Sequence, residues 1–173
     1  MSLSLYQASV PVYQRCLNAF SAILDKAAAH AAAHKIDPAV LLTSRLRPDM
    51  LALTRQVQIF CDSAKNTPAR LAGVELLKLE DNETTIDELK ARIQKTLDFI
   101  KTVPAGAIDA GGDKEIVFPV GPNKMKMKGD EFLLHFALPN FYFHLTTAYA
   151  ILRHCGVTIG KPDYLGAVPM GPA

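Results

Sequence analysis

Two polar residues one helical turn apart, Asn140 and His144, are the clearest sign of chemistry in the sequence. They lie in the stretch from Glu131 to His154, whose dense apolar residues predict a long helix. At about 100° per residue, both side chains fall in the middle of the apolar face of that helix. Because a buried amide or imidazole is costly unless it is hydrogen-bonded, both side chains need polar partners on facing helices.

Pro139 directly precedes this pair and cannot donate a hydrogen bond to the carbonyl of His135, so we expect a kink beside Asn140. A second predicted helix, which begins at Pro48, offers partners along the flank of its apolar face. These candidates are Asp49, Gln56 and Ser63. The polar residues either fix the register of the helices or form the polar floor of a pocket for a small molecule, with a bound metal as one variant.

The elements that must position these residues are four long helices, recognised by apolar residues every three or four positions. They span about Leu5 to His34, Asp49 to Asn66, Thr84 to Pro104 and Glu131 to His154. Pro11 is expected to bend the first helix or restart it near Val10. Thr67-Pro68 is expected to interrupt the second, although residues 69–77 could continue it past a kink. A short helix through Leu42 follows Asp37-Pro38.

Shorter signals complete the predicted architecture. Strict alternation of lysine and methionine from Lys124 to Lys128, across a turn from 115–120, predicts a β-hairpin. Residues 105–114 are expected to form a loop, Gly156 to end the last helix, and 156–173 to form an extended tail. The predicted fold is therefore a single all-α domain over residues 1–173, a four-helix bundle with a small β-hairpin before the last helix.

Composition excludes several classes of protein. The 173 residues are 49% hydrophobic and carry a net charge of +2, which gives no general electrostatic basis for binding nucleic acid. No stretch is long and apolar enough to cross a membrane, and residues 1–6 lack the basic region of a signal peptide. Three widely spaced cysteines, Cys16, Cys61 and Cys155, fit reduced thiols in a core, so we expect a cytoplasmic protein.

Two further clusters are weaker candidates for a site. His30 and His34 share one face near the end of the first helix, but no third ligand is nearby, and an exposed helix terminus is the simpler interpretation. The lysines of the hairpin could attract an anionic ligand, although charged side chains at a strand edge more commonly prevent association. The glycine-containing loops do not match a phosphate-binding motif.

The most specific segment of the sequence runs from Leu133 to His144 (LLHFALPNFYFH) and continues through 146–149. With further matching segments, it resembles a bacterial family of unknown function within the DinB-like (YfiT-like) superfamily. Those further segments are Arg47–Met50, Leu71–Glu75, Glu80–Thr84 and Arg153–Gly156. The resemblance covers nearly the whole chain and implies a four-helix bundle of DinB-like topology, often a homodimer. It also implies a metalloenzyme, since some members are metal-dependent thiol transferases.

In metal-binding members, one histidine of the second helix joins an HxxxH pair on the fourth helix. The resemblance places Asn140 and His144 at that pair, so the first histidine is replaced by asparagine, and Gln56 or Asp49 is the nearest substitute on the second helix. One imidazole with amide oxygens is a weak ligand set for a divalent metal such as zinc or nickel. The resemblance therefore favours the fold and the pocket over the metal chemistry.

The expected function is binding of a small molecule between the helices, at Asn140, His144, Gln56 and Asp49, with a degenerate or absent metal site. Two alternatives remain open. One is a metal-dependent transferase acting on a thiol or similar nucleophile, with His144 as the surviving ligand. The other is a non-catalytic interaction module that forms a homodimer. The sequence does not decide whether the protein is an enzyme.

Overall fold

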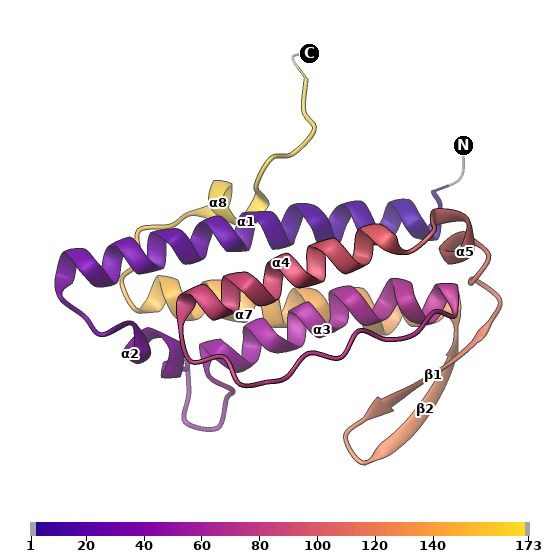
Figure 1. Cartoon of the computed structure of the whole chain (residues 1–173), viewed down its shortest axis with the longest axis horizontal. Coiled ribbons are helices and arrows are strands. Elements are labelled where there is room, and N and C mark those ends of the chain that lie inside the picture. Colours follow the sequence, from indigo (N-terminus) through magenta and orange to yellow (C-terminus); the bar gives the residue numbers. More distant parts are fainter. Residues whose placement is uncertain (1–2, 172–173) are drawn as a thin grey trace.

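Four long helices form the body of the molecule (Figure 1). The computed structural model describes residues 3–171. The four helices are α1 (Leu5–His34), α3 (Leu53–Ala72), α4 (Ile86–Thr102) and α7 (Leu138–His154). Helix α3 packs against both α7 and α4, while α1 packs against α4, α3 and α7. The predicted four-helix bundle is confirmed.

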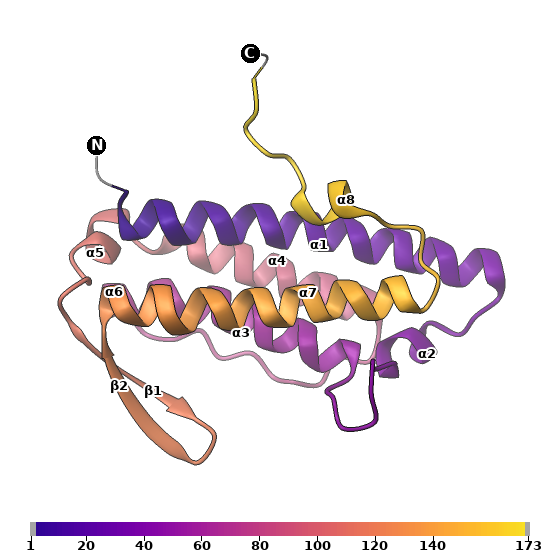
Figure 2. The same ribbon diagram turned by 180° about the vertical axis from the view of Figure 1, so that it is seen from behind.

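The path of the chain places α3 and α7 side by side. The short helix α2 (Pro38–Thr43) lies in the connection between α1 and α3, which run in opposite directions (Figures 1 and 2). Residues 73–85 then run back along the bundle without helical structure, so α4 starts at the same end as α3 and runs parallel to it. This one long crossover leaves α7 antiparallel to α3, with their side chains facing each other.

Helix ends follow the capping signals of the sequence. Asp37 accepts a hydrogen bond from the amide of Ala39 at the start of α2. Thr85 and Glu88 form a reciprocal capping box at the start of α4, satisfying two amides that have no partner within the helix. Helix α1, by contrast, continues through Pro11 from its own capping box at Ser4, so the predicted restart near Val10 was wrong.

Helix α3 differs from its prediction at both ends. It begins at Leu53 rather than near Pro48, because residues 44–52 form an irregular connection instead of a first helical turn. It also continues through Pro68, which is buried, and ends at Gly73 in the left-handed conformation. The predicted interruption at Thr67-Pro68 was therefore wrong, and the extra turn brings Arg70 onto this helix.

The last helical stretch is composite. A short α6 (Gly129–Glu131) leads into a π-helical segment, η1 (Phe132–Ala137), and then into α7. The amide of Leu138 donates to the carbonyl of Leu133, five residues back and immediately before Pro139. The structure thus has a π-helical turn directly before Pro139, where the sequence predicted a kink beside Asn140. Gly156, in the left-handed conformation, follows the end of α7 as predicted.

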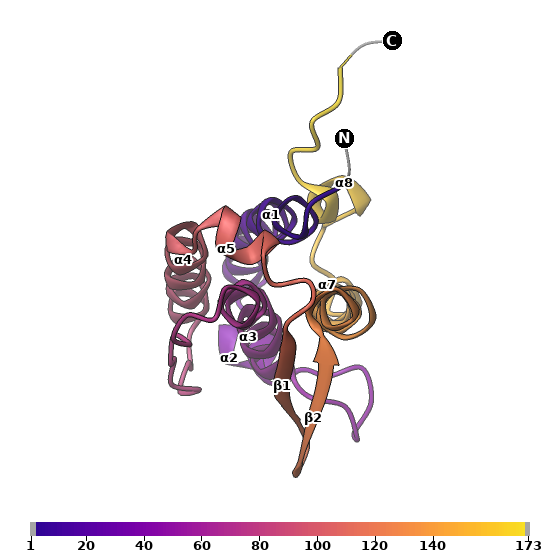
Figure 3. The same ribbon diagram turned by 90° about the vertical axis from the view of Figure 1, so that its right-hand side faces the viewer.

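The hairpin stands at one end of the bundle and leans away from it (Figure 3). Strands β1 (Glu115–Val120) and β2 (Asn123–Lys128) pair in antiparallel register, with Phe118 opposite Met125. Only β1 is well buried, through Ile116 and Phe118. At the base of the hairpin, Gly129 lies so close to the carbonyl of Gly111 that an added Cβ would overlap it, so the fold requires glycine there.

Two segments contain short helices that were not predicted. Residues 105–114, expected to be a loop, include α5 (Ala105–Asp109), and the expected extended tail includes α8 (Lys161–Leu165). Helix α8 packs on α1, where Asp163 pairs with Lys26 (Figure 2). Tyr164 of α8 also hydrogen-bonds Thr146 of α7. No helix within residues 3–171 is long and apolar enough to cross a membrane.

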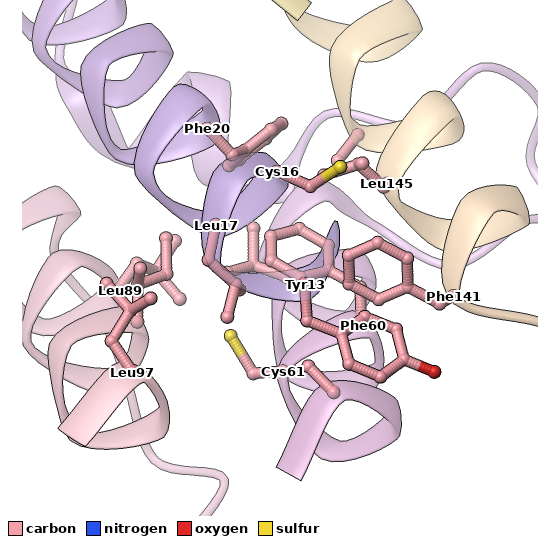
Figure 4. Packing of buried hydrophobic residues seen from close by; sticks show 14 of the residues in the cluster. Tyr13, Cys16, Leu17, Phe20, Phe60, Cys61, Leu89, Leu97, Phe141 and Leu145 are labelled. Carbon is pink, nitrogen blue, oxygen red and sulfur yellow. The ribbon is translucent and has the colours of Figure 1, made fainter. Parts of the chain in front are cut away.

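Aromatic side chains from three helices meet in the centre of the bundle (Figure 4). Tyr13 of α1 meets Phe141 of α7 edge-on at 4.7 Å between ring centroids, and Phe60 of α3 lies against both Phe20 and Phe141. Cys61 is buried in this core, and burial raises the pKa of its thiol to about 12. It therefore stays a neutral thiol, in agreement with the predicted core cysteine.

A buried cation fastens the long crossover to the bundle. Arg92 of α4 is almost completely buried and binds Asp62 of α3, Asp81 and Glu83 of the crossover, all at 2.8–2.9 Å. It also donates to the carbonyl of Glu80 at 3.0 Å. Since a buried charge is tolerated only when paired, this network requires residues 80–83 to lie against α3 and α4.

Candidate functional site

His144 and Gln56 form a buried hydrogen-bonded pair between α7 and α3. Nδ1 of His144 lies 2.7 Å from Oε1 of Gln56, and Nε2 of Gln56 donates to the carbonyl of Leu51 at 3.0 Å. The bond to Leu51 fixes the orientation of the amide, so its oxygen faces the imidazole and accepts from it. His144 is therefore the tautomer protonated at Nδ1.

The surroundings keep this imidazole neutral. Burial, and secondarily the positive charge of Arg55, lowers the pKa of His144 below the ordinary histidine value. Nε2 of His144 makes no hydrogen bond to any residue between 3 and 171. Of the three candidate partners named from the sequence, Asp49, Gln56 and Ser63, it is Gln56 that the structure places against His144.

Asn140 has a separate partner one turn earlier. Its Nδ2 donates to Oγ of Ser63 at 2.8 Å, and both side chains are half-buried. Asn140 and His144 therefore contact α3 at two points, Ser63 and Gln56, which lie seven residues apart on that helix. These two polar contacts fix how α7 sits along α3.

Asp49 does not join this group. It lies in the connection before α3, with its carboxylate largely exposed and 3.9 Å from Arg47. The prediction placed it on the second helix because Pro48-Asp49 resembles a helix start. Since the helix begins at Leu53, Asp49 has no helical register with Gln56, and its assignment to the site was wrong.

A cavity of about 500 Å³ lies beside Asn140, between α3, η1 and the hairpin. One wall is a stripe of mostly polar residues on α3, spaced three or four apart. Its polar members are Arg55, Asp62, Ser63, Asn66, Thr67 and Arg70. The cavity volume is within the range typical of sites for small molecules.

The opposite wall is aromatic and comes from two elements. Phe118 of β1 lies 4.8 Å from Phe132 and 4.5 Å from Phe136, measured between ring centroids. Phe132, Phe136 and Ala137 of the π-helical segment line the cavity together with Phe118 and Val120. The cavity thus combines hydrogen-bonding groups on one side with flat apolar groups on the other.

The structure divides the predicted site into two parts. Asn140 lines the cavity, whereas His144 and Gln56 do not; they lie one turn further along α7 and are bonded to each other. The expectation that Asn140 and His144 together form the floor of one pocket was therefore wrong. The reason is that the cavity is built around the π-helical segment and the hairpin, which diverge from the bundle at the other end of α7.

The residues around His144 do not fit a divalent metal. Within the described part of the chain, residues 3–171, no three His, Cys, Asp or Glu side chains come together in a group able to hold one. The neighbours of His144 are the amide of Gln56 and the cation Arg55, and a positive charge disfavours a second cation. A zinc-like ion needs nitrogen, sulfur or carboxylate donors in greater number.

Sequence reasoning missed Arg70, Asn66 and the phenylalanines of the hairpin and η1 as site residues. Arg70 and Asn66 continue the polar stripe that Ser63 begins, at intervals of three and four residues. That spacing was visible, but the predicted break at Pro68 concealed it. The other weak candidates stay apart from the cavity: His34 is exposed, and its ring stacks on that of His30 at 4.2 Å.

Comparison with known proteins gives a family and a structural relative. Residues 5–165 match the family described as Domain of unknown function (DUF1993). The chain is similar to a crystal structure from Shewanella denitrificans described as a DinB family member protein, with 43% identity and a TM-score of 0.91. The match covers 98% of this chain and 96% of that one. No curated protein matches the sequence.

Proposed function

The chain belongs to DUF1993, a DinB-like family of unknown function, and from this premise we propose that it binds a small molecule in the cavity between α3, η1 and the hairpin. The resemblance to DinB-like proteins stated from the sequence is confirmed. The small-molecule function is the one expected from the sequence, but its site lies at the cavity beside Asn140 instead of at His144 and Gln56. No metal is assigned to the site. Asn140 is the predicted site residue that the two locations share.

The observation that carries the proposal is the composition of the cavity walls. Asn140 and Ser63 present an amide and a hydroxyl, while Phe118 and Phe136 present flat apolar surfaces across the opening. Small-molecule sites combine an apolar lining with a few convergent polar groups. The π-helical turn contributes to the lining, and such turns occur frequently at functional sites.

His144 and Gln56 have a positioning role in this proposal. Their hydrogen bond joins α7 to α3 one turn from Asn140. It thereby sets how far Asn140 projects beside Ser63 and the cavity. His144 supports the cavity and does not contact the ligand.

Thermal-shift screening of small molecules against two variants tests the proposal. Asn140→Leu should keep the fold and lose the rise in Tm that a ligand produces in the wild-type protein. His144→Ala should lower the Tm of the free protein and retain most of the rise on adding ligand. A ligand whose stabilisation survives Asn140→Leu but disappears in His144→Ala would contradict the location proposed.

We do not propose the metal-dependent transferase that the DinB resemblance implies, because His144 is bonded to an amide, and the positive charge of Arg55 acts on it in the same direction as burial, lowering its pKa. Elemental analysis of protein purified without a histidine tag tests this. Metal bound at one equivalent per chain and lost in His144→Ala would restore the transferase as the leading function.

A homodimeric interaction module is a second candidate, and a specific observation favours it. Leu134 and Phe143 in the last helical stretch are more than half exposed, at 54% and 59%. Apolar side chains mark an interface between proteins where they form a contiguous exposed patch, so the test is made on Phe143, the more exposed of the two. Sedimentation velocity over a range of concentrations, compared between the wild-type protein and Phe143→Ser, tests this candidate; a monomer at every concentration would eliminate it.

A further inference from the structure

Arg70 is a cation in the cavity wall without an anionic partner in the described part of the chain. It lies in the last turn of α3 and is half-buried. Within residues 3–171, it forms no ion pair with a carboxylate and no side-chain hydrogen bond. Burial alone lowers the pKa of Arg70, so the guanidinium has lost water without gaining a counter-charge.

The other charges near the cavity are already paired. Arg55 binds Asp81, and Asp62 is bound by both Arg92, at 2.8 Å, and Lys65, at 3.3 Å. No carboxylate of the polar stripe is therefore free to neutralise Arg70. Because a partly buried charge is stabilised by an opposite charge, this position favours an anion supplied from outside the chain.

The geometry of the two walls narrows the class of ligand. A planar guanidinium binds a carboxylate through two parallel hydrogen bonds. Opposite the polar stripe, Phe118 and Phe136 offer surfaces suited to a flat apolar body. Among the cavity-lining residues, Arg55 is already paired with Asp81 and Arg70 is the remaining cation, so a ligand with a single negative charge fits better than a doubly charged phosphate.

We propose that the cavity takes a flat apolar carboxylate, with Arg70 binding the carboxylate and Phe118 and Phe136 contacting the apolar body. This inference rests on the proposed function and deepens it by naming the class of ligand. It also assigns Asn140 and Ser63 to the polar edge of the same ligand, beside the ring.

Three matched probes test the ligand class by isothermal titration calorimetry. They are 2-naphthoate, the uncharged 2-naphthamide and 2-naphthyl phosphate. In the wild-type protein, 2-naphthoate should bind about tenfold or more tightly than 2-naphthamide, because hydrogen bonds to a charged group are the stronger kind. The phosphate should bind more weakly than the carboxylate.

Variants at Arg70 test whether its guanidinium causes the tighter binding of 2-naphthoate. Arg70→Gln should weaken 2-naphthoate to the level of 2-naphthamide and leave 2-naphthamide unchanged, while Arg70→Lys should retain part of the preference. The matched control is Arg153→Gln, which removes the same charge from the exposed last turn of α7 and should change nothing. Circular dichroism of each variant verifies that it is folded.

The contrary outcomes separate the two proposals. Equal binding of 2-naphthoate and 2-naphthamide to the wild-type protein would overturn the role of Arg70 and leave the cavity as a small-molecule site. Tighter binding of the phosphate would overturn the assignment to carboxylates. Binding of none of the three probes would overturn this inference, whereas the Asn140→Leu screen above tests the proposed function separately.

Discussion

The hydrogen bond between His144 and Gln56 should be strongly coupled energetically, and a double-mutant cycle measures the coupling. The changes are His144→Leu, Gln56→Leu and both together. Each single change leaves one buried polar group of the pair without its partner, which costs about 1–3 kcal/mol of unfolding free energy. Gln56→Leu also removes the bond to the carbonyl of Leu51, worth about 1 kcal/mol.

The double variant leaves neither member of the pair unsatisfied and retains only the loss at Leu51. It should therefore be less destabilised than the sum of the two single variants by both penalties, about 2–6 kcal/mol in total. Urea unfolding followed by far-UV circular dichroism gives the change in unfolding free energy of each variant relative to the wild-type protein. If the slope of this free energy against urea concentration is unchanged, each variant exposes the same surface area on unfolding.

A matched pair on the same two helices serves as the control. Ser63→Ala and Asn140→Leu remove the other contact between α3 and α7, where both side chains are half-buried and water can replace the lost bond. Their coupling should be smaller, about 0.5–1 kcal/mol. Additivity at His144 and Gln56 to within about 0.5 kcal/mol would refute the argument that a buried, mutually satisfied pair joins the helices.

Three further predictions concern stability. Arg92→Met should cost about 3 kcal/mol in urea unfolding, because three carboxylates lose a shared buried cation; a cost below about 1 kcal/mol would contradict the network. Gly129→Ala should lower the unfolding free energy by about 1–3 kcal/mol, since the added Cβ would overlap the carbonyl of Gly111. The control Gly106→Ala, which has open space around it, should be neutral or stabilising. Equal effects of the two changes would contradict the close approach of Gly129 to Gly111. Because the pKa of His144 is lowered in the folded state, the unfolded chain binds more protons just below about pH 6.5, so stability should fall as the pH is lowered from that value. Thermal unfolding across this range should show the effect in His135→Gln but not in His144→Gln.

Much of the fold could be predicted because its signals are local. The apolar spacing that predicted α1 and α4, the capping box at Thr85 and the alternation of the hairpin all act within a few residues. Their positions agree closely with the structure. One error falls where tertiary packing outweighs local preference: Pro68 is buried in the core and remains inside α3, which continues to Ala72.

The candidate site was less predictable, because it depends on which elements meet. Periodicity placed Asn140 and His144 on a buried face and named Gln56 and Ser63 among the candidate partners on the second helix. A helical wheel assumes about 100° for every residue, so it could not show the π-helical turn. The separation of Asn140 from His144 depends on the position of the hairpin, which is far from α3 in sequence. Arg70 was missed for the same reason, since its significance depends on the charges that surround it in space.

The π-helical turn also has a consequence for how the length of this chain can vary. An α-helix rotates by about 100° for each residue added or removed, so an insertion or deletion between Phe132 and Ala137 would turn the hairpin about the axis of α7 by that amount. The phenylalanine wall would then face away from α3, while α7, on the other side of the change, would keep its contacts with α3. Relatives that bind the same ligand should therefore keep the length of this segment constant, and those that differ here should have lost the cavity without losing the fold.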